Sequence, residues 1–233
     1  ILDGGNNKMK RDPLKATVLA TRYIPNATQK MVQDLITAGG IIEYDPQRHR
    51  SLALLTADCD DVTYTALDEA TKAAEVDVVY ARSMYAGAGN ASTKLAGEVI
   101  GILAGPSPAE VRSGLNATLD FIDSGVGFVS ANEDDSICYY AQCVSRTGSY
   151  LSKTAGIREG EALAYLVAPP LEAMYALDAA LKAADVEMCE FFAPPTETNF
   201  AGALLTGSQS ACKAACDAFA EAVQSVASNP LGF

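Results

Sequence analysis

The sequence predicts an α+β protein built from two tandem copies of one strand-helix-strand-strand-helix unit. The strongest observation is an internal repeat: residues 66–79 read ALDEATKAAEVDVV, residues 176–189 read ALDAALKAADVEMC, and eight of the fourteen positions are identical. A short apolar run precedes each segment, LALLTA at 52–57 and LAYLVA at 163–168, as expected of a buried strand. A chain of 233 residues is also long enough for two domains with their own cores.

The elements follow one another in the same order in both copies. The first helix of the first copy carries an apolar stripe of alanines, Ala66, Ala70, Ala73 and Ala74. The helices are expected to pack on a mostly antiparallel sheet, and Ser107 and Ser208 are suitable N-caps for the last helix of each copy. The predicted strands and final helices lie at 52–57, 76–82, 97–104 and 108–123 in the first copy, and at 163–168, 186–192, 202–206 and 210–227 in the second.

A further segment precedes each unit, and the two segments resemble each other only loosely. Residues 14–35 predict a strand and then a short helix, with Asn26 as its cap. Residues 137–146 predict a strand before the second unit. We therefore place the first domain at 9–125 and the second at 126–233. Residues 1–8 are polar and rich in Gly and Asn, and we interpret them as an expression remnant.

Composition and charge exclude several classes of function. A formal net charge of −12 argues against a nucleic-acid partner, because binding to phosphates begins with a basic surface, and it favours cationic or amine-bearing small molecules. The sequence has no apolar run long enough to span a bilayer and no secretory signal, so we expect a cytoplasmic protein without a membrane partner. The six cysteines form no CxxC pair and are expected to be reduced and mostly buried.

Catalytic chemistry has little support in the sequence. The single histidine, His49, lies between two arginines and is expected to be a solvated loop residue rather than a general base. Cys212 and Cys216 have the spacing of a helix core stripe and not that of a metal site. Gly87 and Gly89 lack the third glycine of a dinucleotide-binding loop. We therefore expect no catalytic residue, no metal and no cofactor.

An acidic cluster lies between the first strand and the first helix of the first copy. Asp58, Asp60 and Asp61 can cap this helix or interact with its positive end, each contributing about 0.3–1 kcal/mol. Three acids within four residues exceed the needs of a cap and can also bind an ammonium group. An EF-hand is excluded, because Val62 and Thr63 stand where a ligand and a glycine are needed. The residues alone leave capping and ligand binding open.

Five longer motifs lie along the chain: TADCDDVTYTALDEATK, VSRTGSYLS, YLVAPPLEAMYALDAALK, PPTETNF and LTGSQSACKAAC. They resemble bacterial microcompartment shell domains of the trimeric subclass with two domains per chain, including its ethanolamine-utilisation members. In this family the strand that contains LATRYIPN follows the second helix, whereas here it precedes the unit. The resemblance therefore implies two tandem, circularly permuted domains with a ferredoxin-like β-α-β-β-α core, assembled as a pseudohexameric homotrimer.

The resemblance implies a structural role rather than an enzymatic one. The expected protein is a tile that associates with other microcompartment shell proteins and passes small metabolites through pores. Ethanolamine or a similar small amine is expected to bind in a small pore within each subunit. The positions that match the family's binding residues are Asp60, Asp61, Glu98, Phe128 and Thr198.

The resemblance also implies a central pore on the symmetry axis, lined by the loops 84–95 and 193–200. The first loop is rich in small residues and is expected to act as a gate. Lys72 and Lys182 match an edge lysine that packs against its counterpart across neighbouring subunits. The loop residues expected at the pore are Tyr85, Gly87, Gly89, Asn90, Thr196, Glu197 and Asn199.

Two other classes of function remain open on the residues alone. A cytosolic regulatory protein that senses a small molecule could share a duplicated α+β domain, but it would bind one ligand tightly and form no layers. A cytosolic enzyme would need a general base, which the sequence hardly offers.

Overall fold

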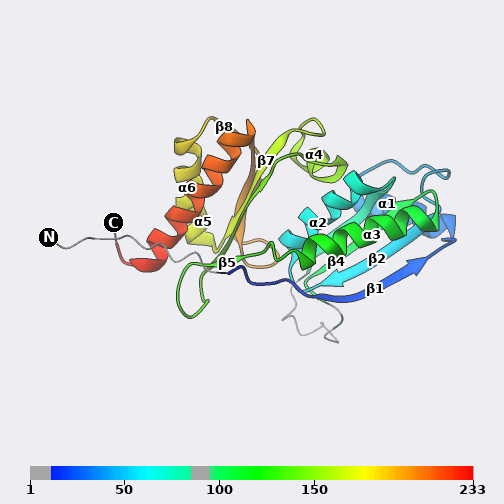
Figure 1. The fold of residues 1–233 in the computed structure, drawn as a ribbon, viewed down its shortest axis with the longest axis horizontal. Helices are drawn as coiled ribbons and strands as arrows, with labels where there is room; N and C mark the ends of the chain where they lie inside the picture. The colour runs from blue at the N-terminus through cyan, green and yellow to red at the C-terminus, as the bar shows by residue number, and fades with distance from the viewer. Residues whose placement is uncertain (1–11, 85–94, 96, 233) are drawn as a thin grey trace.

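The computed structural model describes residues 12–84, 95 and 97–232, which form two antiparallel sheets and their helices (Figure 1). The elements of the first copy are β1 (Val18–Ile24), α1 (Gln29–Gly39), β2 (Ser51–Ala57), α2 (Asp60–Ala73), β3 (Asp77–Ser83), β4 (Val99–Gly105) and α3 (Pro108–Asp123). Those of the second are β5 (Val129–Ser130), β6 (Cys138–Val144), α4 (Ser149–Ala155), β7 (Ala162–Ala168), α5 (Pro170–Ala183), β8 (Val186–Phe192), β9 (Ala201–Gly207) and α6 (Gln209–Ser228).

The predicted repeat is confirmed as β2-α2-β3-β4-α3 in the first copy and β7-α5-β8-β9-α6 in the second. The strand orders are β1-β2-β4-β3 and β5-β6-β7-β9-β8. The strands that precede the two units, β1 and β6, each pair with the first strand of their unit. They therefore occupy equivalent places in the two sheets, although their sequences differ.

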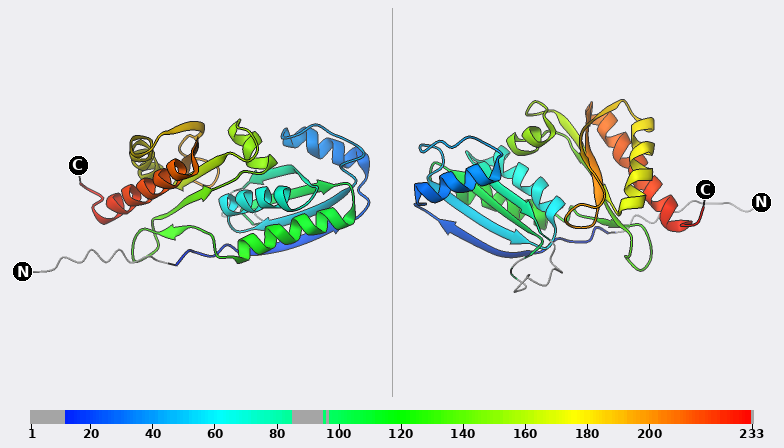
Figure 2. Two further views of the ribbon diagram at one scale, coloured as in Figure 1. Left: turned by 45° about the horizontal axis from the view of Figure 1, so that its top comes forward. Right: turned by 180° about the vertical axis from the view of Figure 1, so that it is seen from behind.

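Helices cover the two sheets unequally. α2 and α3 pack on one face of the first sheet, and α1 packs on the other face over Leu52 and Ile102 (Figure 2). α5 and α6 lie side by side on one face of the second sheet and bury Phe219 (Figure 1). The other face of the second sheet packs against α2, where Tyr165 shares a core with Leu67. The two copies are thus joined by a common hydrophobic core.

The two predicted serine caps are confirmed. Ser107 accepts a hydrogen bond from the backbone N–H of Glu110 at 3.3 Å, at the start of α3. Ser208 accepts from the backbone N–H of Ala211 at 3.1 Å, at the start of α6. Both hydroxyls satisfy N–H groups that have no partner within the helix.

The expectations for the segments before the units need two corrections. Asn26 does not cap α1, because the helix begins later, with Thr28 as its N-cap. The backbone N–H of Ala27 donates to the carbonyl of Arg50 at 2.9 Å, which holds the chain outside the helix at this point. The seven-residue helix α4 was not predicted at all.

The expectation that His49 is solvated is wrong. Its side chain is only 2% exposed, and its Nδ1 accepts a hydrogen bond from the backbone N–H of Asp45 at 3.0 Å. Its Nε2 lies 3.2 Å from a carboxylate oxygen of Asp77, at the start of β3. The imidazole therefore fastens a loop to the sheet.

The cysteines follow the prediction in part. All six are free thiols, and Cys212 and Cys216 are buried in α6 as expected. The other four are only partly buried. Among the helices of the described residues, none has the length and apolar character needed to span a membrane.

Candidate small-molecule site between the two copies

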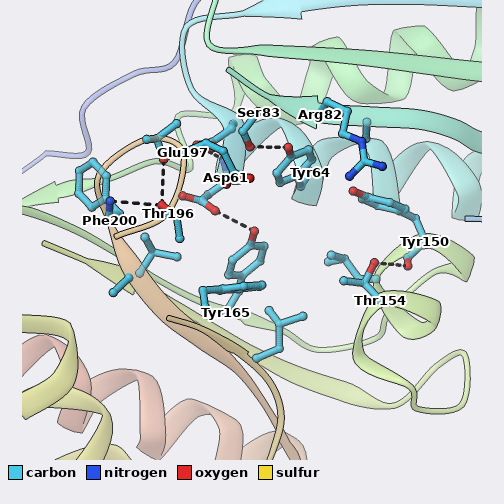
Figure 3. Close-up of a pocket in the computed structure, with 18 residues that line it drawn as sticks. Asp61, Tyr64, Arg82, Ser83, Tyr150, Thr154, Tyr165, Thr196, Glu197 and Phe200 are labelled. Atoms are coloured by element: carbon cyan, nitrogen blue, oxygen red, sulfur yellow. Dashed lines mark hydrogen bonds between the residues drawn. The ribbon is translucent and has the colours of Figure 1, made fainter. Parts of the chain in front are cut away.

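A cavity of about 300 Å³ lies where the two copies meet. The first copy contributes the start of α2 and the end of β3, and the second contributes α4, β7 and the loop between β8 and β9. Figure 3 shows Asp61 and Tyr165 pointing toward each other, with Arg82 and Tyr150 at the opposite end. The cavity is lined by both polar and apolar side chains.

Two adjacent carboxylates form the acidic end of the cavity. Asp60 and Asp61 are the first residues of α2 and are both buried. The hydroxyl of Tyr165 donates to Oδ1 of Asp61 at 2.7 Å, and the hydroxyl of Thr198 reaches Oδ2 of Asp60 at 3.4 Å. Burial raises the pKa of Asp61 well above its usual value, the charge of Asp60 raises it further, and the Tyr165 bond opposes this shift. The site therefore disfavours two negative charges without a cation.

Of the two roles left open for the acidic cluster, capping of this helix by a carboxylate side chain is not observed. The N-cap of α2 is Cys59, and it makes no side-chain capping bond. Asp58 instead accepts a hydrogen bond from the backbone N–H of Thr17 at 2.6 Å. Asp60 and Asp61 lie inside the first turn, where the positive end of the helix partly offsets their charge.

Hydroxyl groups line the rest of the cavity. The hydroxyls of Tyr64 and Ser83 lie 2.5 Å apart, and the hydroxyl of Thr154 donates to the carbonyl of Tyr150 at 3.1 Å (Figure 3). Burial raises the pKa of both Tyr64 and Tyr150, so their hydroxyls stay protonated at neutral pH. The cavity thus offers carboxylates for a cation and neutral hydroxyls for a polar group.

The structure brings together only part of the predicted binding set. Asp60, Asp61 and Thr198 line the cavity, whereas Glu98 and Phe128 do not. Glu98 is close enough for its charge to raise the pKa of Asp61. Its own pKa is raised by burial and by the charges of neighbouring acids.

Phe128 lies in an aromatic cluster outside the cavity. Its ring stacks on Tyr140 with centroids 5.5 Å apart and meets Phe200 edge-on at 5.4 Å. Phe200 lines the cavity, so Phe128 supports the wall from the outer side. It positions the wall without lining the cavity.

The predicted pore residues divide between the cavity and other places. Thr196 and Glu197 line the cavity beside Thr198. Asn199 adopts a left-handed conformation with φ 65°, and its N–H donates to the carbonyl of Thr196 at 3.0 Å, which closes a tight turn. The remaining predicted pore residues, Tyr85, Gly87, Gly89 and Asn90, lie outside the described residues.

The two predicted edge lysines have different environments. Lys72 is largely buried at the junction of the copies, where it donates to the carbonyl of Arg146 at 2.9 Å and lies 3.5 Å from Asp68. It also pairs with Glu69. Lys182 is exposed and pairs with Asp178 on its own helix at 2.6 Å. The lysine at this repeat position is therefore largely buried in the first copy and exposed to solvent in the second.

Sequence reasoning missed Tyr64, Arg82, Tyr150 and Tyr165, which line the cavity. For Tyr165 a signal was available, because it is the one polar residue in the apolar run LAYLVA and the first copy has a leucine there. Such a difference between two copies marks a place where they have different neighbours. Within the described residues, no group of three or more His, Cys, Asp and Glu side chains could hold a metal ion.

Comparisons with known proteins agree on the family. A family model described as the BMC domain matches residues 51–133 and 166–230. The bacterial microcompartment shell protein EutL of Clostridium perfringens is 86% identical over 97% of this chain and 100% of its own length. EutL of Escherichia coli is 51% identical over 94% of this chain and 97% of its length. Both matched ranges leave out β1 and β6, as expected for permuted domains.

Solved structures give the same result. The crystal structure of EutL from Clostridium perfringens has a TM-score of 0.90 and covers 97% of this chain and 99% of that one. The ethanolamine utilization protein EutL from Leptotrichia buccalis has a TM-score of 0.89 at 68% identity, covering 97% and 100%. A PduB shell protein at 21% identity shares the fold, with a TM-score of 0.72. With two BMC domains in tandem, the chain belongs to the BMC-domain family of bacterial microcompartment shell proteins.

Proposed function

We propose that this protein is a homotrimeric tile in the shell of an ethanolamine-utilisation microcompartment, and that the cavity between its copies binds a small primary amine. The names of the EutL relatives support the first part. Loops 84–95 and 193–200 would line a threefold pore that passes small metabolites. The main support for the trimer is the interface between the two copies of one chain. The repeat contains the same two kinds of surface a second time, a helix of one copy and a sheet of the other, and this second pair is exposed.

Within the chain, α2 of the first copy packs on the second sheet through residues of complementary size. The hydroxyl of Tyr140 on β6 donates to the hydroxyl of Thr65 on α2 at 3.0 Å. Tyr165 on β7 meets Asp61 in the same way. At both contacts a large sheet residue faces a smaller helix residue.

On α5 of the second copy the helix residues are large. Tyr175 and Leu171 occupy the repeat positions of Thr65 and Asp61. They are 57% and 66% exposed in a single chain. Exposed side chains of this size in the middle of a repeated contact surface indicate a protein partner.

On the first sheet the corresponding residues are small or apolar. Ala20 and Leu54 take the places of Tyr140 and Tyr165, and both are partly exposed. The size relationship of the internal interface is therefore reversed, and α5 of one subunit fits the first sheet of the next. A contact of this head-to-tail kind, repeated three times, closes a ring of six domains.

A charged residue introduced into the proposed subunit interface tests the trimer. Leu171→Asp should convert the trimer to monomer in sedimentation velocity, because the new carboxylate would be buried without a partner. Leu231→Asp is the matched control, since Leu231 is also exposed but lies beyond α6. A wild-type chain that stays monomeric at every concentration, or a Leu171→Asp protein that stays trimeric, would refute the assembly.

The ligand is inferred from the chemistry of the cavity. A primary ammonium group gains most where two carboxylates are buried together, as Asp60 and Asp61 are. The hydroxyls of Tyr64, Ser83 and Thr196 can bond a hydroxyl on the same ligand. The cavity has a volume of about 300 Å³, and a water molecule takes up about 30 Å³, so a ligand of four heavy atoms would share the cavity with several waters.

Calorimetry with ethanolamine tests the ligand. We expect a Kd no tighter than roughly 40 μM, because four heavy atoms at about 1.5 kcal/mol each have a ceiling near 6 kcal/mol. Asp61→Asn should abolish the heat of binding, Asp217→Asn should not, and ethylene glycol should give none. Affinity should rise with pH through the pKa of Asp61, since the ammonium must displace its proton. Equal heats for wild type and Asp61→Asn would contradict the assignment.

A further inference from the structure

Helix α4 of the second copy is capped by a carboxylate from the first copy. Asp68 on α2 is fully buried, and its two oxygens accept hydrogen bonds from the backbone N–H groups of Gly148 and Leu151, at 2.7 and 2.8 Å. The N-cap of α4 is Gly148, which has no side chain of its own to do this. The positive end of a helix favours such a carboxylate, whichever segment supplies it.

The repeat places a second carboxylate in the equivalent position. Asp178 on α5 corresponds to Asp68 on α2. The side chain of Asp178 is 64% exposed and pairs with Lys182. Lys182 in turn corresponds to Lys72, which lies beside Asp68 in the buried copy. The exposed copy therefore has the same pair of charges.

The helix that corresponds to α4 is α1, and its N-terminus is exposed. Each helix begins five residues after the end of its edge strand, so Thr28 corresponds to Gly148 and Met31 to Leu151. Thr28 makes no side-chain capping bond, and the first turn of α1 has no acidic residue. Met31 is 39% exposed, whereas Leu151 is buried against the first copy.

We propose that Asp178 of one subunit caps helix α1 of a neighbouring subunit, accepting hydrogen bonds from the backbone N–H groups of Thr28 and Met31. This inference rests on the trimer proposed above and identifies a polar contact that holds it together. Met31 would pack against α5 as Leu151 packs against α2. The internal interface is the template for both contacts.

The proposed contact differs from the internal one at two repeat positions. A Cβ atom on Gly148 would lie 2.2 Å from the hydroxyl oxygen of Thr71, so α4 and α2 approach as closely as glycine allows. The same Cβ would lie 2.7 Å from the backbone carbonyl of Asp68, so α1, which has Thr28 at this position, must lie farther from α5. Leu181 replaces Thr71, whose hydroxyl accepts from the N–H of Ser149 at 3.0 Å, so this bond has no counterpart. The carboxylate at this helix position, Asp68 within the chain and Asp178 between subunits, would be the acceptor common to both contacts.

The test compares two exposed aspartates that each pair with a lysine on their own helix. Asp217 pairs with Lys213 four residues away on α6, as Asp178 pairs with Lys182 on α5. Loss of a cap weakens each contact roughly tenfold, so three contacts raise the dissociation constant of the trimer about a thousandfold. The concentration at which half of the trimer dissociates varies as the square root of this constant, so it should rise about thirtyfold. We expect this for Asp178→Ala in dilution experiments by mass photometry, and no change for Asp217→Ala.

A second measurement uses two substitutions, one that adds a carboxylate at the contact and one that removes a carboxylate from it. Thr28→Asp supplies α1 with its own cap but places a carboxylate against Asp178, and it should weaken the trimer. Adding Asp178→Asn should restore much of the stability, since the repulsion is removed. If the wild type trimerises but Asp178→Ala behaves like Asp217→Ala, the cap is overturned and the trimer stands. A wild type that never trimerises overturns both.

Discussion

The hydrogen bond between Tyr165 and Asp61 offers a direct measure of how strongly the cavity joins the two copies. Tyr165→Phe removes the donor, which lies 2.7 Å from the carboxylate oxygen. The phenyl ring keeps the contacts with Tyr140 and Phe192, whose centroids are 5.5 and 6.1 Å away. The loss is therefore that of one hydrogen bond to a buried charged group, roughly 1.5–3 kcal/mol.

A second buried tyrosine provides the control. Tyr139 on the neighbouring strand accepts a hydrogen bond from Nε2 of Gln224 at 2.8 Å. Tyr139→Phe removes a bond between neutral groups, which is worth roughly 1 kcal/mol. Urea unfolding at one fixed protein concentration should therefore show the larger loss for Tyr165→Phe.

The pH dependence separates the two variants further. The Tyr165 bond stabilises the charged form of Asp61, whose pKa burial raises. As the pH falls through that raised pKa, Asp61 takes up a proton and the bond becomes an ordinary neutral one. The excess loss of Tyr165→Phe over Tyr139→Phe should therefore shrink toward acid and grow toward alkali. Equal losses at every pH would refute the charged contact.

Other substitutions test the site and the core separately. Asp61→Asn keeps an acceptor for Tyr165 but removes an acid whose pKa is raised above 3.8 in the folded state. Between its unfolded and folded pKa values the folded chain binds more protons, so stability falls as pH rises. In the absence of amine, urea unfolding should give Asp61→Asn a higher free energy of unfolding than the wild type at neutral pH, but not at pH 3. The same difference at both pH values would contradict this prediction. Phe219→Ala should lower the free energy of unfolding by about 3–5 kcal/mol and the half-exposed Phe191→Ala by far less. Ser208→Ala should lower it by about 1 kcal/mol.

Much of the fold was predictable because its signals are local. The helix at 108–123 and the strand at 186–192 match α3 and β8 residue for residue, since caps, glycines and periodicity lie within each segment. Helix α4 was missed for the opposite reason. It has only seven residues and a glycine N-cap, and the carboxylate of Asp68 that completes it comes from the other copy.

The candidate site shows the same division. The acids Asp60 and Asp61 were recognisable, because three carboxylates in four residues exceed what a helix start needs. Their partner Tyr165 lies 104 residues away from Asp61, and no sequence window contains both. The environment of His49 was predicted wrongly for a similar reason, because Asp77 on β3 holds this loop residue in the interior.

By itself the sequence determined that there are two copies, which elements each contains and to which family they belong. Repeats, periodicity and caps act over short stretches of chain, and they survive in any arrangement of the copies. Only the tertiary structure decided which surfaces of the copies meet. Packing α2 on the second sheet buries one set of repeat positions and leaves the matching set on α5 exposed. Equivalent residues thereby acquire different neighbours, which is why Asp61 faces a cavity while Leu171 faces solvent.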